Sequence, residues 1–451
     1  MSEENNKKSN DNNLIFEEIE NNIKILFEKF NNSLIVLDEI EDWNGVIQFN
    51  LEEKFYFNIY NSGQQLVYFR GKADNPDCSV IMPSEIVNKL FSGDFNIIIF
   101  FEAMMNNKMK INGSSSHFMK LTSIIEYFED EKLEESKVCE DDWIVEAPED
   151  HDMKSDLLNQ AAKNLKKLDI NRNSFLVVRH GVLVFEEYYG RRSYKIRQRM
   201  HYNIASVTKT IAALVVGVAI TKGLFTVDDL ITDWIPDPAK GIVPGSKIKH
   251  LLTQTSETEP PGTKFKYNSR DEINTLGKII TKAAGMPSKD FAKESLFDPL
   301  GIHEYSWNKV VAEKTDLPIG SGMKISPRDA ARLSQLFLSR GKWDGNQIIS
   351  EQYIDEMIKP SFLDVNSGYG YLVWLNNSLG KWNRPFKNGT GRMIPNAPED
   401  MFMATGFFGR FIFVIPSLDV IVVTFGKKFV MESLDTAREI YNIIEPALPS
   451  E

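Results

Sequence analysis

Hydrophobic and polar residues follow one another with different periods along the chain, and each change of period predicts a new structural element. Residues 1–13 are polar and rich in Asn, so we predict a disordered tail there. Over residues 14–30 the apolar positions recur with the spacing of an amphipathic helix. Between Trp43 and Gly71 the pattern becomes an alternation, which is typical of strands, with a turn at Asn61-Ser62-Gly63.

The next segments complete a first domain and mark its end. They predict a helix over residues 82–91, a strand over 108–112 and a helix over 117–128. An acidic stretch follows, and we place the domain boundary there because few contacts are expected to cross such a polar segment. The predicted division is a tail over residues 1–13, a small α+β domain over 14–135, an acidic linker over 136–155 and a second domain over 156–447.

The second domain is predicted to begin and end with strands. A helix over residues 155–168 is followed by a hairpin over 175–189, and a second hairpin over 411–425 precedes a terminal helix over 432–444. Helices fill the sequence between these hairpins. The pattern therefore predicts one antiparallel sheet, built from distant segments and flanked by helices. We therefore predict that the whole chain belongs to the α+β or the α/β class.

Composition and charge narrow the class of protein. Of the 451 residues, 42% are hydrophobic and 25% charged, as is ordinary for a soluble globular protein, and the net charge of -11 argues against a nucleic-acid partner. The two cysteines and six histidines have no metal-ligand spacing, so we expect no metal and no cofactor. The N-terminus lacks the apolar core of a signal peptide, and no apolar run reaches the roughly 20 residues of a transmembrane helix. We therefore expect a cytoplasmic protein.

The strongest candidate for a catalytic motif is the stretch Ser206-Val207-Thr208-Lys209. It opens an apolar run that predicts a buried helix, so Ser206 would lie among the free N–H groups at the helix start. Lys209 would lie one turn along on the same face, within reach of the serine hydroxyl. This arrangement suits a nucleophilic serine whose proton is taken by a base and whose attack creates an oxyanion. A helix-capping serine followed by a solvated lysine would give the same four residues.

Several segments in the second domain occur in the same order along the chain as in one enzyme family. Together with the S-x-x-K stretch they resemble the β-lactamase-related serine hydrolases, a group of class C β-lactamases, penicillin-binding proteins, esterases and amide hydrolases. The resemblance covers about Ser174 to Phe425. The segments are Asp228-Asp229-Leu230, His250 to Ser256, Pro261 to Ser269, Asp298 to Ile302 and Ala404-Thr405-Gly406-Phe407-Phe408-Gly409.

The resemblance implies a catalytic set. Ser206 matches the acylated serine, Lys209 the lysine that shares its proton, and Tyr267 the tyrosine that acts with the lysine as base. A tyrosine is a base only as a phenolate, which a nearby cation favours. The oxyanion hole would combine the backbone N–H of Ser206 with that of Phe407, or of Ala404 in the other register. Tyr267 would also fit a core position, and Phe407 and Phe408 either line an acyl pocket or simply pack.

The sequence departs from the family pattern at the positions implied to contact substrate. Ser269 stands where the Y-x-N motif has asparagine. Ala404 precedes Thr405 and Gly406 where lactam-binding relatives have a cation for the substrate carboxylate. The missing cation makes the chain more similar to the esterase and amide-hydrolase members than to lactamases.

A second resemblance concerns the first domain. Short motifs between Trp43 and Phe128 are similar to the sterol carrier protein type 2 domain, which implies a mixed sheet covered by helices around an apolar tunnel for acyl chains or sterols. The stretch from Phe100 to Met109 is apolar and rich in methionine, which suits a pocket for varied lipids and an ordinary core equally well. The motifs are Gly71-Lys72-Ala73-Asp74, the helix near Glu85 to Leu90, Ser92-Gly93-Asp94, Lys108 to Gly113 and Met119-Lys120-Leu121.

The leading hypothesis is a serine hydrolase that cleaves a small-molecule ester or amide through an acyl-enzyme on Ser206. Its first domain would bind a fatty-acyl or sterol ligand. One alternative is a hydrolase fold that has lost activity and serves as a lipid-binding or scaffold protein. The intact set of Ser206, Lys209 and Tyr267 argues against it. The other alternative is a β-lactamase or D-amino-acid peptidase, against which the missing cation argues.

Overall fold

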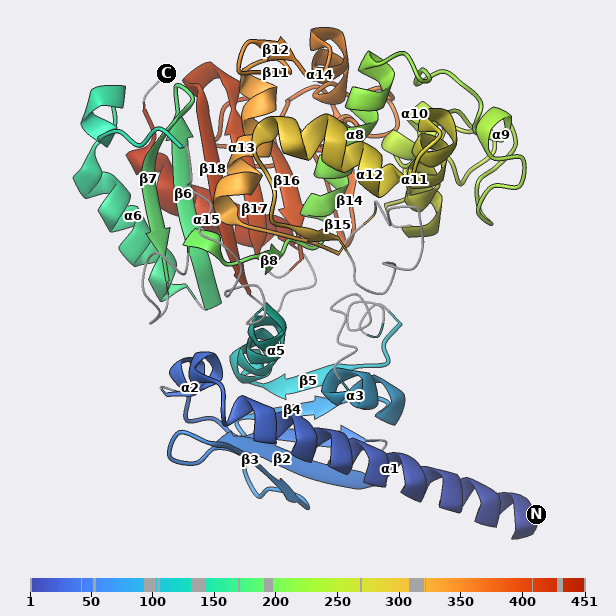
Figure 1. Ribbon diagram of the computed structural model, residues 1–451, viewed down its shortest axis with the longest axis vertical. Coiled ribbons are helices and arrows are strands. Elements are labelled where there is room, and N and C mark those ends of the chain that lie inside the picture. The colour runs from blue at the N-terminus through green and yellow to red at the C-terminus, as the bar shows by residue number, and fades with distance from the viewer. Residues whose placement is uncertain are drawn as a thin grey trace. The chain divides into compact units, whose positions relative to one another are not determined.

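The computed structural model divides into two compact units, which consist chiefly of residues 1–140 and 141–451. It describes residues 2–41, 43–51, 54–92, 103, 106–130, 143–168, 171–189, 198–267, 270–307, 320, 322–407, 409–427 and 433–449. Within these ranges, none of the helices is both long enough and apolar enough to cross a bilayer. The predicted fold class is confirmed, since each unit packs helices against a sheet (Figure 1).

The first unit contains a five-stranded mixed sheet in the order β3-β2-β1-β4-β5. β1 and β4 run parallel, and the other neighbouring pairs are antiparallel. The strands are β1 (Ile47–Leu51), β2 (Phe55–Asn61), β3 (Leu66–Arg70), β4 (Cys78–Ile81) and β5 (Lys110–Gly113). The helices with these strands are α1 (Ser2–Phe30), α2 (Leu34–Ile40), α3 (Ser84–Phe91) and α5 (Ser115–Asp130).

The core of the first unit is a cluster of phenylalanine rings. Phe49 of β1 and Phe57 of β2 are paired across the ladder, and their rings stack with centroids 4.7 Å apart. Phe91 of α3 and Phe118 of α5 meet Phe49 edge to face, so both helices cover the same face of the sheet. All four side chains are buried, and burial of one such ring stabilises the fold by about 1.5–3 kcal/mol.

The first unit departs from the sequence predictions in three elements. α1 begins at Ser2, within the segment predicted to be a disordered tail, and no Gly or Pro interrupts the chain before Phe30. The other two elements, α2 and β4, are absent from the predicted pattern. β4 is only four residues long, and it is a strand because β1 and β5 pair with it on either side.

The second unit is built on a six-stranded sheet in the order β13-β16-β17-β18-β6-β7, so the two predicted hairpins lie side by side. The described registers for β6–β7, β13–β16, β16–β17 and β17–β18 are antiparallel. The strands are β6 (Asn171–Arg179), β7 (Val182–Tyr188), β13 (Trp374–Leu375), β16 (Phe402–Gly406), β17 (Arg410–Ile415) and β18 (Val420–Lys427).

Helices cover both faces of this sheet. α8 (Val207–Thr221) and α13 (Pro327–Leu338) lie in front of it in Figure 1, and α15 (Ser433–Ile444) lies behind it and contacts α6 (Ser155–Lys167). α8 is buried along almost its whole length, as expected for a helix that is apolar on all sides. The central position of α8 fixes its first residues against the sheet.

Part of the predicted acidic linker belongs to the second unit. Val145 forms a parallel bridge with Leu183 of β7, and the N–H of Leu183 donates to the carbonyl of Ile144. His151 is buried nearby, with Nε2 2.6 Å from a carboxylate oxygen of Glu146. The backbone of residues 144–146 therefore pairs with β7, while residues 131–142 lie outside the described part of the chain.

Candidate active site

Ser206 is the residue that precedes α8, and its backbone is held on both sides. Ala205 has a positive φ of 48°, which is unusual for a residue with a Cβ, and its N–H donates to the side-chain oxygen of Asn203 at 2.9 Å. The N–H of Lys209 donates to the carbonyl of Ser206 at 3.0 Å. The Ser206 hydroxyl makes no capping hydrogen bond to the helix, so it is not engaged as a helix cap. Strained backbone of this kind recurs at functional sites.

The side chain of Lys209 returns along α8 toward the serine. Its Nζ lies 3.1 Å from Ser206 Oγ and donates to the carbonyl of Gly320 at 2.7 Å. Only 4% of the residue is exposed. Burying an ammonium is costly unless it is well paired, and here the nitrogen has two oxygen partners, one of which is the Ser206 hydroxyl.

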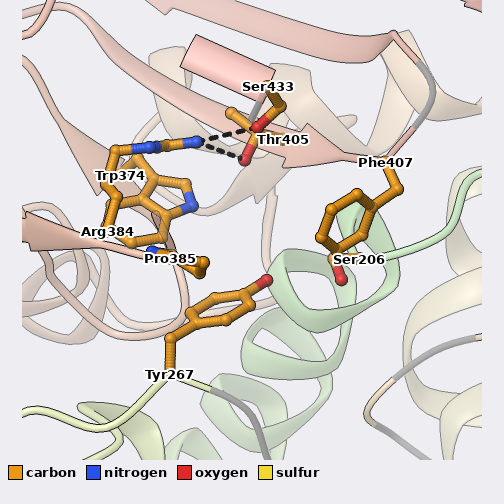
Figure 2. A pocket seen from close by; sticks show the side chains of 8 residues that line it. All are labelled: Ser206, Tyr267, Trp374, Arg384, Pro385, Thr405, Phe407 and Ser433. Atoms are coloured by element: carbon orange, nitrogen blue, oxygen red, sulfur yellow. Dashed lines mark hydrogen bonds between the residues drawn. The ribbon is translucent and has the colours of Figure 1, made fainter. Parts of the chain in front are cut away.

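Tyr267 reaches the same place from the loop before α11 (Arg270–Ala284). Lys209 Nζ lies 5.4 Å from the centroid of its ring, and Figure 2 shows its hydroxyl pointing toward Ser206. The ring packs against Trp374 at 5.5 Å between centroids and against Tyr369 at 6.4 Å. Burial raises the pKa of Tyr369 well above its usual value, so that phenol remains neutral and supports the Tyr267 ring by packing.

A pocket of about 290 Å³ opens between these side chains (Figure 2). The eight residues that line it come from six stretches of the second unit: Ser206, Tyr267, Trp374, Arg384, Pro385, Thr405, Phe407 and Ser433. A second hollow of about 800 Å³ shares Tyr267, Arg384 and Pro385 with it.

Residues of β16 and the residue that follows it face either this pocket or a separate apolar cavity. Thr405 and Phe407 line the pocket with Ser206. Ala404 instead lines a separate apolar cavity together with Val207 of α8. The side chain of Ala404, which the sequence places among the substrate contacts, is thus directed away from the pocket.

Gly406 lies where β16 passes close to the two residues that precede Ser206. A Cβ at this position would lie 2.5 Å from the carbonyl oxygen of Ile204 and 3.3 Å from the Cβ of Ala205. Only glycine allows this approach without a shift of the backbone. Gly406 therefore contributes to the site through its lack of a side chain.

The turn after β16 is held by two buried arginines. The ladder with β17 ends at the pair Gly406–Arg410, and Phe407 follows in the turn. Arg410 donates to the carbonyl of Phe407 at 3.0 Å, and Arg172 of β6 donates to the carbonyl of Gly409 at 3.3 Å. Burial lowers the pKa of Arg172 to about 10, so it remains charged at neutral pH. The Phe407 N–H, one candidate for the oxyanion hole, thus lies in a braced turn.

Ala404 supplies no cation, as the sequence shows, but an arginine from another strand lines the pocket. Arg384 ends the short strand β14 (Lys381–Arg384), and its Nη2 donates to Thr405 Oγ1 at 3.3 Å and to Ser433 Oγ at 3.0 Å. Sequence reasoning missed this residue because it searched for the cation at Ala404. No motif marks Arg384, and only the tertiary fold brings β14 beside β16.

The described residues thus bring Ser206, Lys209, Tyr267, Thr405, Gly406 and Phe407 together. The predicted contacts Ser269 and Phe408, and the first-domain residues Phe100, Phe101, Met104 and Met105, lie outside the described residues. In the part of the chain that the structure describes, no group of three His, Cys, Asp or Glu side chains could hold a metal ion.

Comparisons with known proteins agree with this division of the chain. The model of the beta-lactamase family matches residues 159–443, and that of the SCP-2 sterol transfer family matches residues 24–126. An uncharacterized protein of Alkalihalophilus pseudofirmus, BpOF4_21049, is 21% identical over 61% of this chain and 91% of its own length. Esterase EstB of Burkholderia gladioli is 33% identical over a stretch that makes up 33% of this chain. The same stretch spans half of the esterase's length.

The fold of the second unit also occurs in solved structures. A β-lactamase from Mycobacterium bovis, Mb2281c, superimposes with a TM-score of 0.50 at 19% sequence identity. The superposition covers 64% of this chain and all of the other chain. At this identity the similarity establishes the fold of the second unit.

Proposed function

Because the chain belongs to the β-lactamase family and carries an SCP-2 domain ahead of it, we propose that it is a serine hydrolase that forms an acyl-enzyme on Ser206 and cleaves an ester or amide. The observation that carries the proposal is the 3.1 Å separation between Lys209 Nζ and Ser206 Oγ at the edge of a pocket that Tyr267 also lines. A nucleophile within hydrogen-bond reach of a positioned base is what covalent catalysis by serine requires. The esterase among the relatives supports the choice of substrate class.

The first step is the attack of Ser206 on the substrate carbonyl. Lys209 and Tyr267 act as one proton-transfer unit, which takes the hydroxyl proton as the Oγ–carbon bond forms. The carbonyl oxygen becomes an oxyanion, and the backbone N–H groups of Ser206 and Phe407 donate to it. The same unit then returns the proton to the leaving alcohol or amine as the bond to the acyl carbon breaks.

The second step releases the acyl group. A water molecule enters the place of the leaving group and gives its proton to the Lys209–Tyr267 unit as it attacks the ester carbon. Collapse of the second tetrahedral intermediate returns the proton to Ser206 Oγ and frees the acid. The pocket beside Ser206 shares Tyr267, Arg384 and Pro385 with the larger hollow, and we expect the water to enter from that side.

The direct test is hydrolysis of a series of p-nitrophenyl esters from acetate to palmitate, with one chromogenic cephalosporin for comparison. The proposal predicts turnover of at least one ester by the wild-type protein and loss of that turnover in Ser206→Ala. An inactive scaffold would cleave none of these compounds. Efficient turnover of the cephalosporin with no ester turnover would favour the β-lactamase alternative.

For the first unit we propose that it binds a fatty-acyl or sterol ligand. The family match over residues 24–126 supports this, as does the apolar face of the sheet, where the Phe49 and Phe57 rings lie beneath α3 and α5. A ligand that binds only folded protein raises the melting temperature of the unit that holds it. Pockets for small ligands are lined predominantly by hydrophobic and aromatic side chains.

Calorimetry of the whole chain tests this ligand. The Ser206→Ala protein is used so that no acyl transfer occurs, and its melting is compared with and without palmitate or cholesterol. Phe49→Leu marks the transition of the first unit, because it weakens only that core. The proposal predicts a higher melting temperature for that transition with one ligand. No shift with either ligand, and no co-purified lipid in native mass spectrometry, would overturn it.

A further inference from the structure

Lys209 is held in place by a main-chain carbonyl as well as by the serine. Its Nζ donates to the carbonyl of Gly320 at 2.7 Å, a shorter contact than the 3.1 Å to Ser206 Oγ. A lysine carries its charge on a flexible four-carbon stem, so the partners of the nitrogen decide where it lies. Proton transfer requires two atoms within about 2.6–3.2 Å of each other. The position of the Gly320 carbonyl therefore decides whether Lys209 reaches the hydroxyl.

Gly320 is in turn held by a side chain of α11. Its N–H donates to Oδ1 of Asn274 at 3.0 Å. Glycine has the widest backbone freedom of any residue, so Gly320 depends on bonds of this kind for a defined conformation. The residues on either side of the asparagine, Ile273 and Thr275, are buried, and α11 packs against α8. The side chain that holds Gly320 thus extends from a firmly packed helix.

The chain after Gly320 is bound to the start of α8 at a second place. β10 (Met323–Ile325) begins three residues later. The carbonyl of Met323 accepts the N–H of Ile204 at 3.0 Å, and its own N–H donates to Thr208 Oγ1 at 3.3 Å. Hydrogen bonds at Met323 therefore fix one end of this stretch, and the asparagine fixes the other end, where the carbonyl meets the lysine.

We propose that Asn274 is a positioning residue of the hydrolase, which through the backbone of Gly320 holds Lys209 Nζ beside Ser206 Oγ for proton transfer. The inference rests on the proposed function and adds to it a residue that does not line the pocket. α11 then supports both members of the proton-transfer unit, because Tyr267 lies three residues before its first residue.

Asn274→Ala tests the inference, because it removes the acceptor of the Gly320 N–H. The variant should lose about 10- to 100-fold in kcat for a p-nitrophenyl ester with little change in KM, since displacements near 1 Å in a catalytic site cost up to about 100-fold. The rate at which a fluorophosphonate labels Ser206 should fall in parallel, because it depends on the same activated hydroxyl. Asn274→Asp retains an oxygen acceptor and should lose less in both measurements.

Asn377→Ala is the matched control. Asn377 is also half-buried, and its Oδ1 accepts the N–H of Leu379 at the same distance of 3.0 Å, but it does not line the pocket. This variant should keep a kcat close to that of the wild-type protein. Asn274→Leu preserves the side-chain volume, and it takes the place of Asn274→Ala in every comparison if the alanine variant does not fold.

A double variant separates positioning from a merely structural role. If Asn274 acts through Lys209, its removal should cost little more once the amine is gone, so Asn274→Ala should barely lower the residual kcat of Lys209→Ala. An equal loss in both backgrounds would make Asn274 a structural residue and overturn the inference.

Other results would also overturn the inference while leaving the hydrolase intact. They are a kcat of Asn274→Ala equal to that of Asn377→Ala, and a loss confined to KM. A wild-type protein that cleaves no ester, and whose Ser206 takes no fluorophosphonate label, would overturn the proposed hydrolase function and this inference with it.

Discussion

Gly406 and Ile204 lie so close that a Cβ on the glycine would be 2.5 Å from the isoleucine carbonyl oxygen. Ile204 is two residues before Ser206, the proposed nucleophile, and Gly406 is one residue before Phe407. The contact therefore sets the spacing between the two backbone segments that would form the oxyanion hole. Atoms of the main chain cannot move aside as a flexible side chain can, so an added methyl group must push these segments apart.

Gly406→Ala should impair both activity and stability. The shift of β16 away from Ser206 should lower kcat at least about 10-fold, because displacements near 1 Å in a catalytic site cost up to about 100-fold. Overpacking should cost about 1–3 kcal/mol of stability. Gly380→Ala is the matched control, since its Cβ would make an ordinary 3.5 Å contact with Ser367. Equal activity of the two variants would show that the close approach is unimportant for catalysis.

Lys209 and Tyr267 should behave as one unit in mutant kinetics. Lys209→Ala and Tyr267→Phe should each lower kcat about 100-fold or more, within the usual worth of general base catalysis. The double variant should be little worse than either single variant, because residues that act on one proton lose activity non-additively. Steady-state kinetics on one ester supply the comparison. Losses that multiply would mean that the two side chains act on different steps.

Arg410 should act as a positioning residue for the turn that follows β16. It donates to the Phe407 carbonyl, so Arg410→Met removes a brace from the proposed oxyanion donor. The stabilisation of an oxyanion exists only in the transition state. The variant should therefore lose up to about 100-fold in kcat with little change in KM. Arg410→Lys retains a donor and should lose less. A change confined to KM would argue against the role of the turn.

His201 should make the second unit less stable in mild acid. Burial lowers its pKa to about 4, and the charge of Lys324 adds to the effect, which outweighs a hydrogen bond to the backbone of Glu304. In the unfolded chain the imidazole has its usual pKa of about 6.5. The unfolded state therefore binds a proton between pH 6.5 and 4 that the native state does not, so stability falls as the pH falls through this window.

A histidine variant isolates this contribution from that of other groups. Between pH 7 and pH 5, His201→Gln should lose about 2 kcal/mol less stability than the wild-type protein, as follows from 1.36 kcal/mol per pH unit below pH 6.5. Urea unfolding followed by tryptophan fluorescence measures the difference, because all tryptophans except Trp43 lie in the second unit. Parallel pH profiles of the two proteins would show that His201 titrates normally.

Short patterns of hydrophobic, polar and turn residues correctly predicted the hairpins and the buried helix of the second unit. The hairpins around residues 179–181 and 416–419 are confirmed, because alternation and turn residues specify them within a few positions. The buried helix after Ser206 is also confirmed, since it is apolar on every side. The strand β4 was missed because its four residues carry almost no periodicity, and its partners are distant in sequence.

In the candidate site, too, the contacts within one helix were predictable and those between distant segments were not. The positions of Ser206 and Lys209 follow from one turn of helix, so their contact was predictable from the S-x-x-K spacing. The charge in the pocket was not predictable, because Arg384 comes from a hairpin that the tertiary fold places beside Thr405. The direction of the Ala404 side chain was not predictable either. It depends on how β16 pairs with β17 and on which of its faces lies against α8.

The most direct test of the central claim is to identify the residue that a fluorophosphonate labels. Such a reagent reacts with a serine hydroxyl that a neighbouring base activates, and the adduct is stable enough for peptide mass spectrometry. We expect the label on the peptide that contains Ser206, and its loss in Ser206→Ala. Labelling that persists undiminished in Ser206→Ala, or that is absent from the wild-type peptide, would contradict the assignment of Ser206 as the nucleophile.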